Sequence, residues 1–192
     1  MEIDSAKIKK FTINLLRGKN TYSILFYIIV IYLASVYVAL PAVYAFTPVS
    51  YISSVLSGSM SHSAPTIQLT YYDWLTQHGF NNSQTSTWPY QRGIDIGSLL
   101  IAYKVSPEQI KVGDVIIFDA FYNGVYEDIV HRVINITVIN GTYYYTTKGD
   151  ANPSSLPIEV DIPYSHVVGK VGDVIPYLGY PRYLLYLLGN LL

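Results

Sequence analysis

The sequence contains no cysteine, and charged residues make up only 13% of it. The absence of cysteine excludes disulfide frameworks, thiolate metal sites and a cysteine nucleophile. A typical soluble domain has about 25% charged residues, so the low fraction fits a chain that lies partly in lipid. The segment after Thr47 has seven basic and eleven acidic residues. Because it offers no basic stripe to follow a phosphate backbone, nucleic-acid binding is not expected.

Long apolar runs are also rare, but one, with no charged side chain, is present at residues 22–46. A membrane-spanning helix needs roughly 20 apolar residues, so this run predicts a transmembrane helix, with Pro41 expected to kink its outer end. Residues 1–21 carry five basic and two acidic residues. The positive-inside rule therefore predicts a single-pass protein with a cytoplasmic N-terminus and an extracytoplasmic domain at residues 47–192.

A cleaved signal peptide is the alternative for this run, and Ala39-Leu40-Pro41-Ala42 resembles an Ala-x-Ala cleavage site. The run exceeds the 7–15 residues of a signal-peptide core, which favours an uncleaved anchor. A second apolar segment, residues 180–192, is too short to span a bilayer. It could lie at the lipid interface, pack on the outer domain or contact the membrane helix of a partner.

The outer domain has the pattern of a mainly β, antiparallel fold, either a small barrel or a sandwich. Short runs rich in β-branched and aromatic residues are separated by turn signals, at Ser98–Val105, Val115–Phe118, Ile129–Ile139, Thr142–Thr147 and Val167–Val174. Asn140-Gly141 predicts a hairpin turn, because both central positions of such turns favour a positive φ. Residues 61–97 form a polar and aromatic excursion; its aromatic clusters indicate an ordered segment, with a short helix at Tyr71–His78.

Three polar residues in the outer domain have the chemistry of a serine hydrolase. Ser59 lies in Ser-Gly-Ser-Met shortly after the apolar run, His131 precedes Arg132, and Asp150 closes Lys148-Gly149-Asp150. Serine becomes a nucleophile when a neighbouring base takes its proton, and histidine held by a carboxylate is the usual base near neutral pH. His62, His78 and His166 lack metal-ligand spacing, so no metal and no cofactor is expected.

The order of these segments resembles type I signal peptidase, in the branch found in archaea and the endoplasmic reticulum. The matching segments are residues 57–60, 112–118, 129–134, 147–153 and 167–171. The resemblance implies a β-rich domain against the cell membrane or the endoplasmic reticulum membrane. It also implies a serine endopeptidase that removes signal peptides from exported preproteins, with membrane lipid and further complex subunits as possible partners.

The resemblance assigns Ser59 as nucleophile, His131 as general base, Asp150 as the acidic residue that orients it and Ser57 as an oxyanion donor. In the bacterial branch a lysine replaces the histidine; Lys104, Lys111 and Lys148 are the rival bases here. Relatives often carry a second aspartate six residues after the first, where this chain has Leu156. Glu159 or Asp161 could supply that carboxylate, or Asp150 could act alone.

The anchor also predicts how substrate is selected. Ser59 follows Phe46 by about a dozen residues, which keeps it within reach of the bilayer surface. Shallow pockets for small residues are expected along Tyr51–Leu56 and Ser98–Tyr103, with the substrate added as a strand, while Met60 points toward lipid. Arg132 is expected to pair with a nearby acid. The alternative functions are a non-catalytic membrane-tethered β subunit of a secretion complex and a processing protease for other membrane-proximal substrates.

Overall fold

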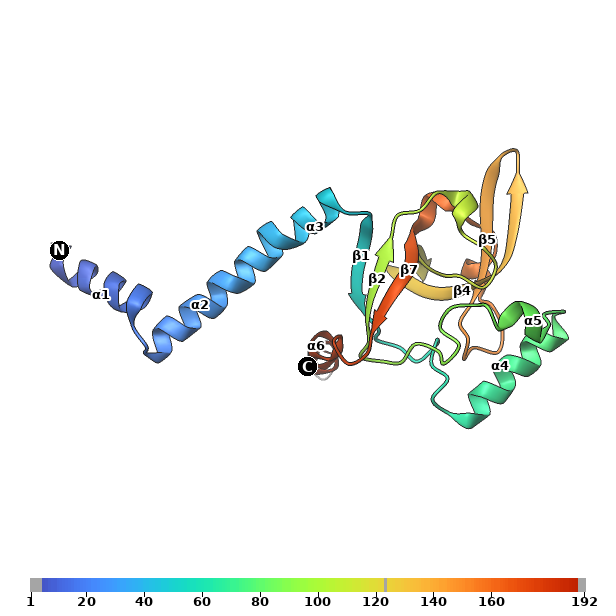
Figure 1. Cartoon of the computed structure of the whole chain (residues 1–192), viewed down its shortest axis with the longest axis horizontal. Helices are drawn as coiled ribbons and strands as arrows, with labels where there is room; N and C mark the ends of the chain where they lie inside the picture. The colour runs from blue at the N-terminus through green and yellow to red at the C-terminus, as the bar shows by residue number, and fades with distance from the viewer. Residues whose placement is uncertain (1–4, 123, 190–192) are drawn as a thin grey trace. The chain divides into compact units, whose positions relative to one another are not determined.

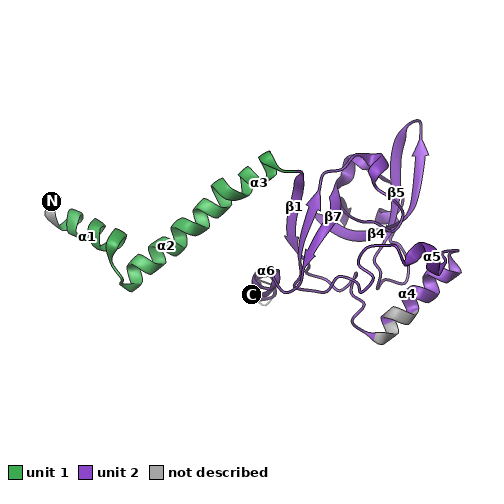
Figure 2. Cartoon of the chain, in the orientation of Figure 1, with its two compact units in different colours: residues 1–47 green, residues 48–192 purple. Residues whose placement is uncertain are grey.

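The computed structural model describes residues 5–122 and 124–189. The ends of the predicted cytoplasmic segment and outer domain, residues 1–4 and 190–192, and Asn123 lie outside the described residues. The chain divides into two compact units, Met1–Thr47 and Pro48–Leu192 (Figure 2). This division falls close to the boundary expected from the sequence.

The first unit is helical. It consists of α1 (Ser5–Arg17), α2 (Thr21–Ala34), a π-helical turn (Ser35–Ala39) and α3 (Leu40–Phe46). The Asn20 side chain caps α2 by accepting from the backbone N–H of Ser23. From Thr21 to Phe46 the helix is continuous over 26 residues, and its most apolar 18-residue window has a mean hydropathy of 2.4. By length and composition it can span a membrane once, as the sequence predicts.

The irregularity expected at Pro41 is found in the turn before it. A proline has no N–H to donate and its ring clashes with the carbonyl four residues earlier, here that of Tyr37. The chain widens into a π turn, in which the N–H of Leu40 donates to the carbonyl of Ser35. A single wide turn of this kind accommodates proline without ending the helix.

The second unit is built on one antiparallel sheet (Figure 1). Its strands are β1 (Val49–Ser54), β2 (Leu99–Tyr103), β3 (Val115–Tyr122), β4 (Val125–Ile139), β5 (Thr142–Lys148), β6 (Ile162–Pro163) and β7 (Val167–Ile175). The seven strands lie in the order β1-β2-β7-β3-β4-β5-β6. The prediction of a mainly β, antiparallel domain is confirmed, and each of the five expected runs coincides with all or part of a strand.

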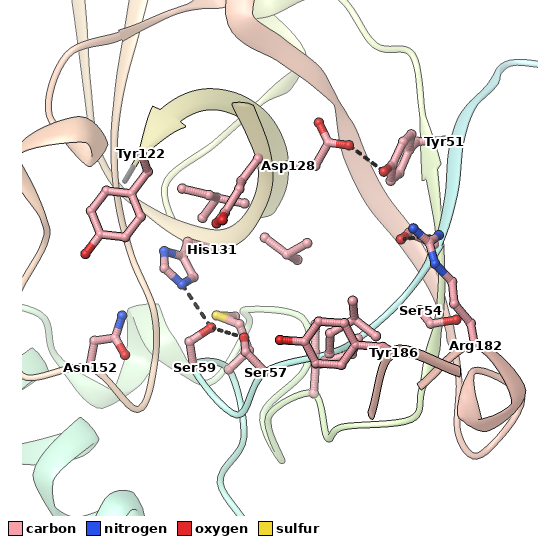
Figure 3. A pocket seen from close by; sticks show the side chains of 18 of the residues that line it. Tyr51, Ser54, Ser57, Ser59, Tyr122, Asp128, His131, Asn152, Arg182 and Tyr186 are labelled. Carbon is pink, nitrogen blue, oxygen red and sulfur yellow. Dashed lines mark hydrogen bonds between the residues drawn. The ribbon is translucent and has the colours of Figure 1, made fainter. Parts of the chain in front are cut away.

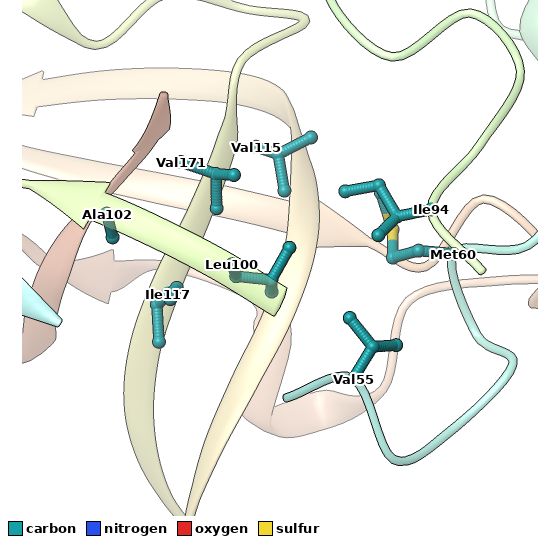
Figure 4. Packing of buried hydrophobic residues seen from close by; sticks show 8 residues of the cluster. All are labelled: Val55, Met60, Ile94, Leu100, Ala102, Val115, Ile117 and Val171. Atoms are coloured by element: carbon teal, nitrogen blue, oxygen red, sulfur yellow. The ribbon is translucent and has the colours of Figure 1, made fainter. Parts of the chain in front are cut away.

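β3 is buried on both faces. Successive side chains of a strand point to opposite sides, and Val115 and Ile117 pack into one cluster with Leu100 and Met60 (Figure 4). Ile116 and Phe118 pack into the other cluster. Two cores on one strand explain why this segment reads as a continuous apolar run, and they hold its neighbour β4 firmly in register.

β4 is long and changes partner along its length. Its first part pairs with β3 from Val125 to Arg132, and its second part pairs with β5 from Arg132 to Ile139. The β4–β5 hairpin closes at Asn140 and Gly141, whose φ values of 50° and 79° confirm the predicted turn. The part of β4 that precedes Arg132 therefore pairs with β3 on one edge, and its other edge is not paired with β5.

The polar and aromatic excursion is ordered, as predicted. It forms α4 (Pro65–Gln77) and α5 (Asn82–Thr85), and Tyr71, Leu75 and Trp88 form a small buried cluster of their own. α4 begins earlier than the predicted helix because proline is well tolerated in a first turn, where its missing N–H has no partner to lose. Tyr71 of α4 packs against the His62 ring and the Arg132 guanidinium.

The remaining elements are short. In the described part of the chain, 3-10 turns occur at Pro107–Gln109, Pro157–Glu159 and Tyr164–His166, and α6 (Tyr180–Gly189) follows the sheet. Arg182 of α6 donates to the Ser53 hydroxyl at 3.1 Å, so the C-terminal segment contacts the domain. Its Leu184, Leu185 and Leu188 remain exposed, which leaves the lipid and partner alternatives open for that side of the helix.

We expect Ile117→Ala to lower the free energy of unfolding by about 2–5 kcal/mol, because the side chain is fully buried and leaves a cavity. Chemical denaturation of the full chain in detergent measures this change. Val138→Ala, at an exposed position of β4, is the control and should stay within about 0.5 kcal/mol. Equal losses in both variants would contradict the assignment of the core.

Candidate active site

Ser59 and His131 meet at the floor of a cavity (Figure 3). Ser59 lies in the loop that follows β1, and His131 lies on β4 opposite Ile116. The Oγ atom of Ser59 and the Nε2 atom of His131 are 3.0 Å apart. The two side chains are 72 residues apart in sequence, and the structure brings them together as the motifs predicted.

The other ring nitrogen of His131 contacts Glu159. Its Nδ1 atom is hydrogen-bonded to Oε1 of this carboxylate, which is fully buried. Glu159 also accepts from the backbone N–H of Leu156 at 2.7 Å and from the Thr147 hydroxyl at 3.2 Å. An ionised carboxylate can only accept, so Nδ1 carries the hydrogen. Nε2 is then left to accept the Ser59 proton.

Asp150 was expected to orient His131, but the structure places Glu159 there instead. The Asp150 carboxylate accepts from Arg132 through Nε at 2.8 Å and Nη2 at 2.7 Å, and it contacts Nε2 of His62 at 3.0 Å. Asp150 therefore lies behind the site, and Arg132 has the acidic partner that the sequence predicted. Glu159 was one of two alternatives, and the other, Asp161, is exposed. Sequence spacing alone could not choose, because a turn at Pro157–Glu159 brings the carboxylate in.

Burial and charge act in opposite directions on Asp150. Burial on its own raises the pKa of this carboxyl group, but the Arg132 guanidinium, through its charge and its hydrogen bonds, and then His62 outweigh that effect. The pKa of Asp150 is therefore lowered from its ordinary value, and the carboxylate is ionised in the folded protein.

Ser57 lies beside the nucleophile. Its Oγ atom is 3.3 Å from Oγ of Ser59, and its side chain is exposed. This hydroxyl can rotate to donate to an oxygen placed near Ser59. The position agrees with the oxyanion role that the resemblance implies for it.

The backbone around Ser59 is held from two sides. The carbonyl of Ser59 accepts from the N–H of Ala151 at 2.8 Å, and the carbonyl of Met60 accepts from the N–H of Ile94 at 2.7 Å. The expectation that Met60 points toward lipid is wrong, because its side chain is buried in the core. Gly149 is needed for close approach: a Cβ there would lie 2.7 Å from Nε2 of His131.

Lys148 is the only one of the rival bases that lies near this group of residues. Its Nζ atom donates to the carbonyls of Gly149 at 2.9 Å and Asp150 at 3.3 Å, and lies 4.7 Å from the centre of the Trp74 ring. Burial lowers its pKa from 10.5 to about 8. Its hydrogen bonds nonetheless point to backbone carbonyls, whereas His131 contacts Ser59 directly.

The cavity above the dyad has a volume of about 520 Å³. β1, at one edge of the sheet, contributes Tyr51, Ser53 and Ser54, and β4 contributes 127–131 from the part that precedes its pairing with β5. The Tyr51 hydroxyl donates to Asp128 across the cavity (Figure 3). Two strand edges thus border one cleft that ends at Ser59.

The lining predicted from the sequence is half right. Tyr51 and residues 53–56 line the cavity, but the lining does not include Ser98–Tyr103. That segment forms β2 and pairs with the opposite edge of β1. Ile129 and Val130 of β4 take its place. The misassignment arose because strand order cannot be read from the hydrophobic pattern of single strands.

Within residues 5–122 and 124–189, no cluster of three or more His, Asp or Glu side chains is arranged to hold a metal ion. Neither a protein-family model nor a curated protein sequence matches this chain. The geometry of the site therefore carries the functional argument.

The lowered pKa of Lys148 predicts how stability depends on pH. Between pH 8 and 10 the unfolded lysine, with its ordinary pKa of 10.5, binds more protons than the folded one, so the contribution of Lys148 to the free energy of unfolding should rise with pH. Denaturation of the full chain across this range measures the slope. Lys148→Met should remove this contribution, while Lys104→Met, at an exposed lysine, should keep it. An unchanged slope in Lys148→Met would contradict the lowered pKa of Lys148.

Proposed function

We propose that this chain is a membrane-anchored serine endopeptidase that removes signal peptides from exported preproteins. The observation that carries the proposal is the hydrogen-bonded series Ser59–His131–Glu159 at the end of a cleft bordered by two strands. A serine, its base and a buried carboxylate on the far ring nitrogen form the arrangement that activates a hydroxyl for acyl transfer.

The chemistry follows from the geometry. His131 Nε2 takes the Ser59 proton while Oγ bonds to the scissile carbonyl carbon, and the carbonyl electron pair moves onto oxygen. The Ser57 hydroxyl and the Ser59 N–H donate to this oxyanion; one such donor is worth about 2.7–4 kcal/mol of barrier. When the C–N bond breaks, His131 gives its proton to the leaving amine. Water then hydrolyses the acyl-enzyme, and the serine proton is restored.

The cleft supports a peptide substrate. An extended peptide between the edges of β1 and β4 can add to the sheet by main-chain hydrogen bonds, and alternate side chains then enter pockets along the cleft. The apolar lining next to the dyad, from Val55, Ile129 and Val130, suits small aliphatic residues. The cleavage sites of signal peptides carry such residues.

The membrane span supports the choice of substrate. A span at Thr21–Phe46 tethers the domain to a bilayer, where the leaders of exported preproteins also lie. A processing protease for other membrane-proximal proteins would use the same chemistry, and a non-catalytic tethered subunit would use none. The intact hydrogen bond between Ser59 and His131 favours an enzyme over the non-catalytic subunit.

Incubation of the detergent-solubilised protein with a preprotein tests the proposal. We expect cleavage after a small residue in wild type, none in Ser59→Ala or His131→Ala, and a loss of about 10²–10³ in kcat for Ser57→Ala. Ser165→Ala, at an exposed serine of the Tyr164–His166 turn, is the control. No cleavage by wild type would favour the non-catalytic subunit, and cleavage of other membrane proteins alone would favour the other protease.

Glu159→Gln separates the two candidate carboxylates. Glutamine can donate to Nδ1 and favour the wrong tautomer of His131, so we expect kcat to fall by up to about 10⁴-fold. Asp161→Asn is the matched control, because Asp161 is exposed and asparagine tolerates its φ of 54°. A normal rate in Glu159→Gln together with a loss in Asp161→Asn would reverse the assignment.

A further inference from the structure

The proposed mechanism leaves a buried group of charges unused. His62, Arg132 and Asp150 are each at most 3% exposed, and Asp150 contacts both of the others behind the catalytic dyad. Burying ionised groups is costly unless each is paired and hydrogen-bonded. Nothing in the acyl-transfer chemistry requires His62, and its partners give it a definable role.

Both nitrogens of the His62 ring face acceptors. Nε2 lies 3.0 Å from the Asp150 carboxylate, and Nδ1 lies 3.2 Å from the backbone carbonyl of Gln91. A carbonyl oxygen cannot donate, and Asp150 is held in its ionised form by Arg132. Since a neutral imidazole has only one N–H, satisfying both contacts requires the imidazolium form.

This ion cluster is attached to both members of the dyad. His62 is three residues after Ser59 in the same loop, and Arg132 is the residue after His131 on β4. Asp150 joins them: it binds His62 and Arg132 through its carboxylate, and the next residue, Ala151, donates its N–H to the Ser59 carbonyl. A shift at any of the three contacts would change the separation of Ser59 and His131.

Resting on the proposed function, we propose that His62 is a positioning residue that, as an imidazolium bound to Asp150, fixes the nucleophile loop at hydrogen-bonding distance from His131. It touches neither the substrate cleft nor the reacting atoms, since it does not line the cavity. Its effect is on the rate of the chemical step. A misplacement of about 1 Å at a reacting group can cost on the order of 100-fold in rate.

The protonation state of His62 is tested first, by ¹⁵N NMR of the imidazole rings in the full-length wild type at pH 7. The charged groups that face this ring are Asp150, Arg132, Asp95 and, across the Tyr71 ring, Lys148. We expect both His62 nitrogens to carry hydrogen. A neutral ring with one bare nitrogen would overturn the proposal, whatever the activity of the protein.

Two amide substitutions then separate the contacts of His62. The side-chain nitrogen of glutamine can occupy the place of Nε2, and that of asparagine the place of Nδ1. We expect His62→Asn, which loses the Asp150 contact, to lower kcat on the order of 100-fold with little change in KM. His62→Gln should retain most of the rate. His166→Gln is the matched control, because His166 also pairs with an aspartate, Asp119, but is exposed.

Thermal unfolding of each variant ensures that rates are compared for folded protein. Equal rates in the two His62 variants, or a change in KM alone, would overturn the proposal. Labelling of Ser59 by a fluorophosphonate probe separates this inference from the proposed function. If wild type labels but cleaves no preprotein, the function fails, and slower labelling in His62→Asn than in His62→Gln still supports the positioning role. Equal labelling rates would overturn it.

Discussion

The direction of two adjacent side chains on β4 determines the arrangement of the site. Successive residues of a strand point to opposite faces, so His131 faces the cleft and Ser59, while Arg132 faces the buried carboxylate of Asp150. The fully buried apolar residues of β3 hold β4 in register, and this register fixes the directions of His131 and Arg132 together. A slip of one residue would exchange the two side chains and place a guanidinium against the nucleophile.

Local patterns in the sequence were sufficient for five of the strands and for the two residues of the dyad. Runs of β-branched and aromatic residues mark β2, β3, β4, β5 and β7, and Asn140-Gly141 marks a hairpin whose φ values are both positive. Ser59 and His131 each lie in a short motif. β1 and β6 were not predicted, since β1 follows the membrane segment without a turn signal and β6 has only two residues.

Contacts between distant segments were beyond the sequence. The partner of His131 depends on how the chain turns after Asp150, and the 3-10 turn at Pro157–Glu159 brings in a glutamate that no fixed spacing indicates. Met60 is apolar, and its composition alone fits lipid as well as a core; only the packing against Ile94 and Leu100 decides. The order of strands likewise decided which segment borders the cleft.

The structure also explains why a lysine next to the site is not the base. Lys148 has a pKa lowered by burial to about 8, which by itself suits a general base. Geometry opposes this role, because its Nζ atom is held by the carbonyls of Gly149 and Asp150 and lies over Trp74. The same turn keeps a glycine against His131, where a Cβ would be too close to Nε2. The turn after β5 thus holds the lysine on backbone carbonyls and leaves room for the imidazole at Ser59.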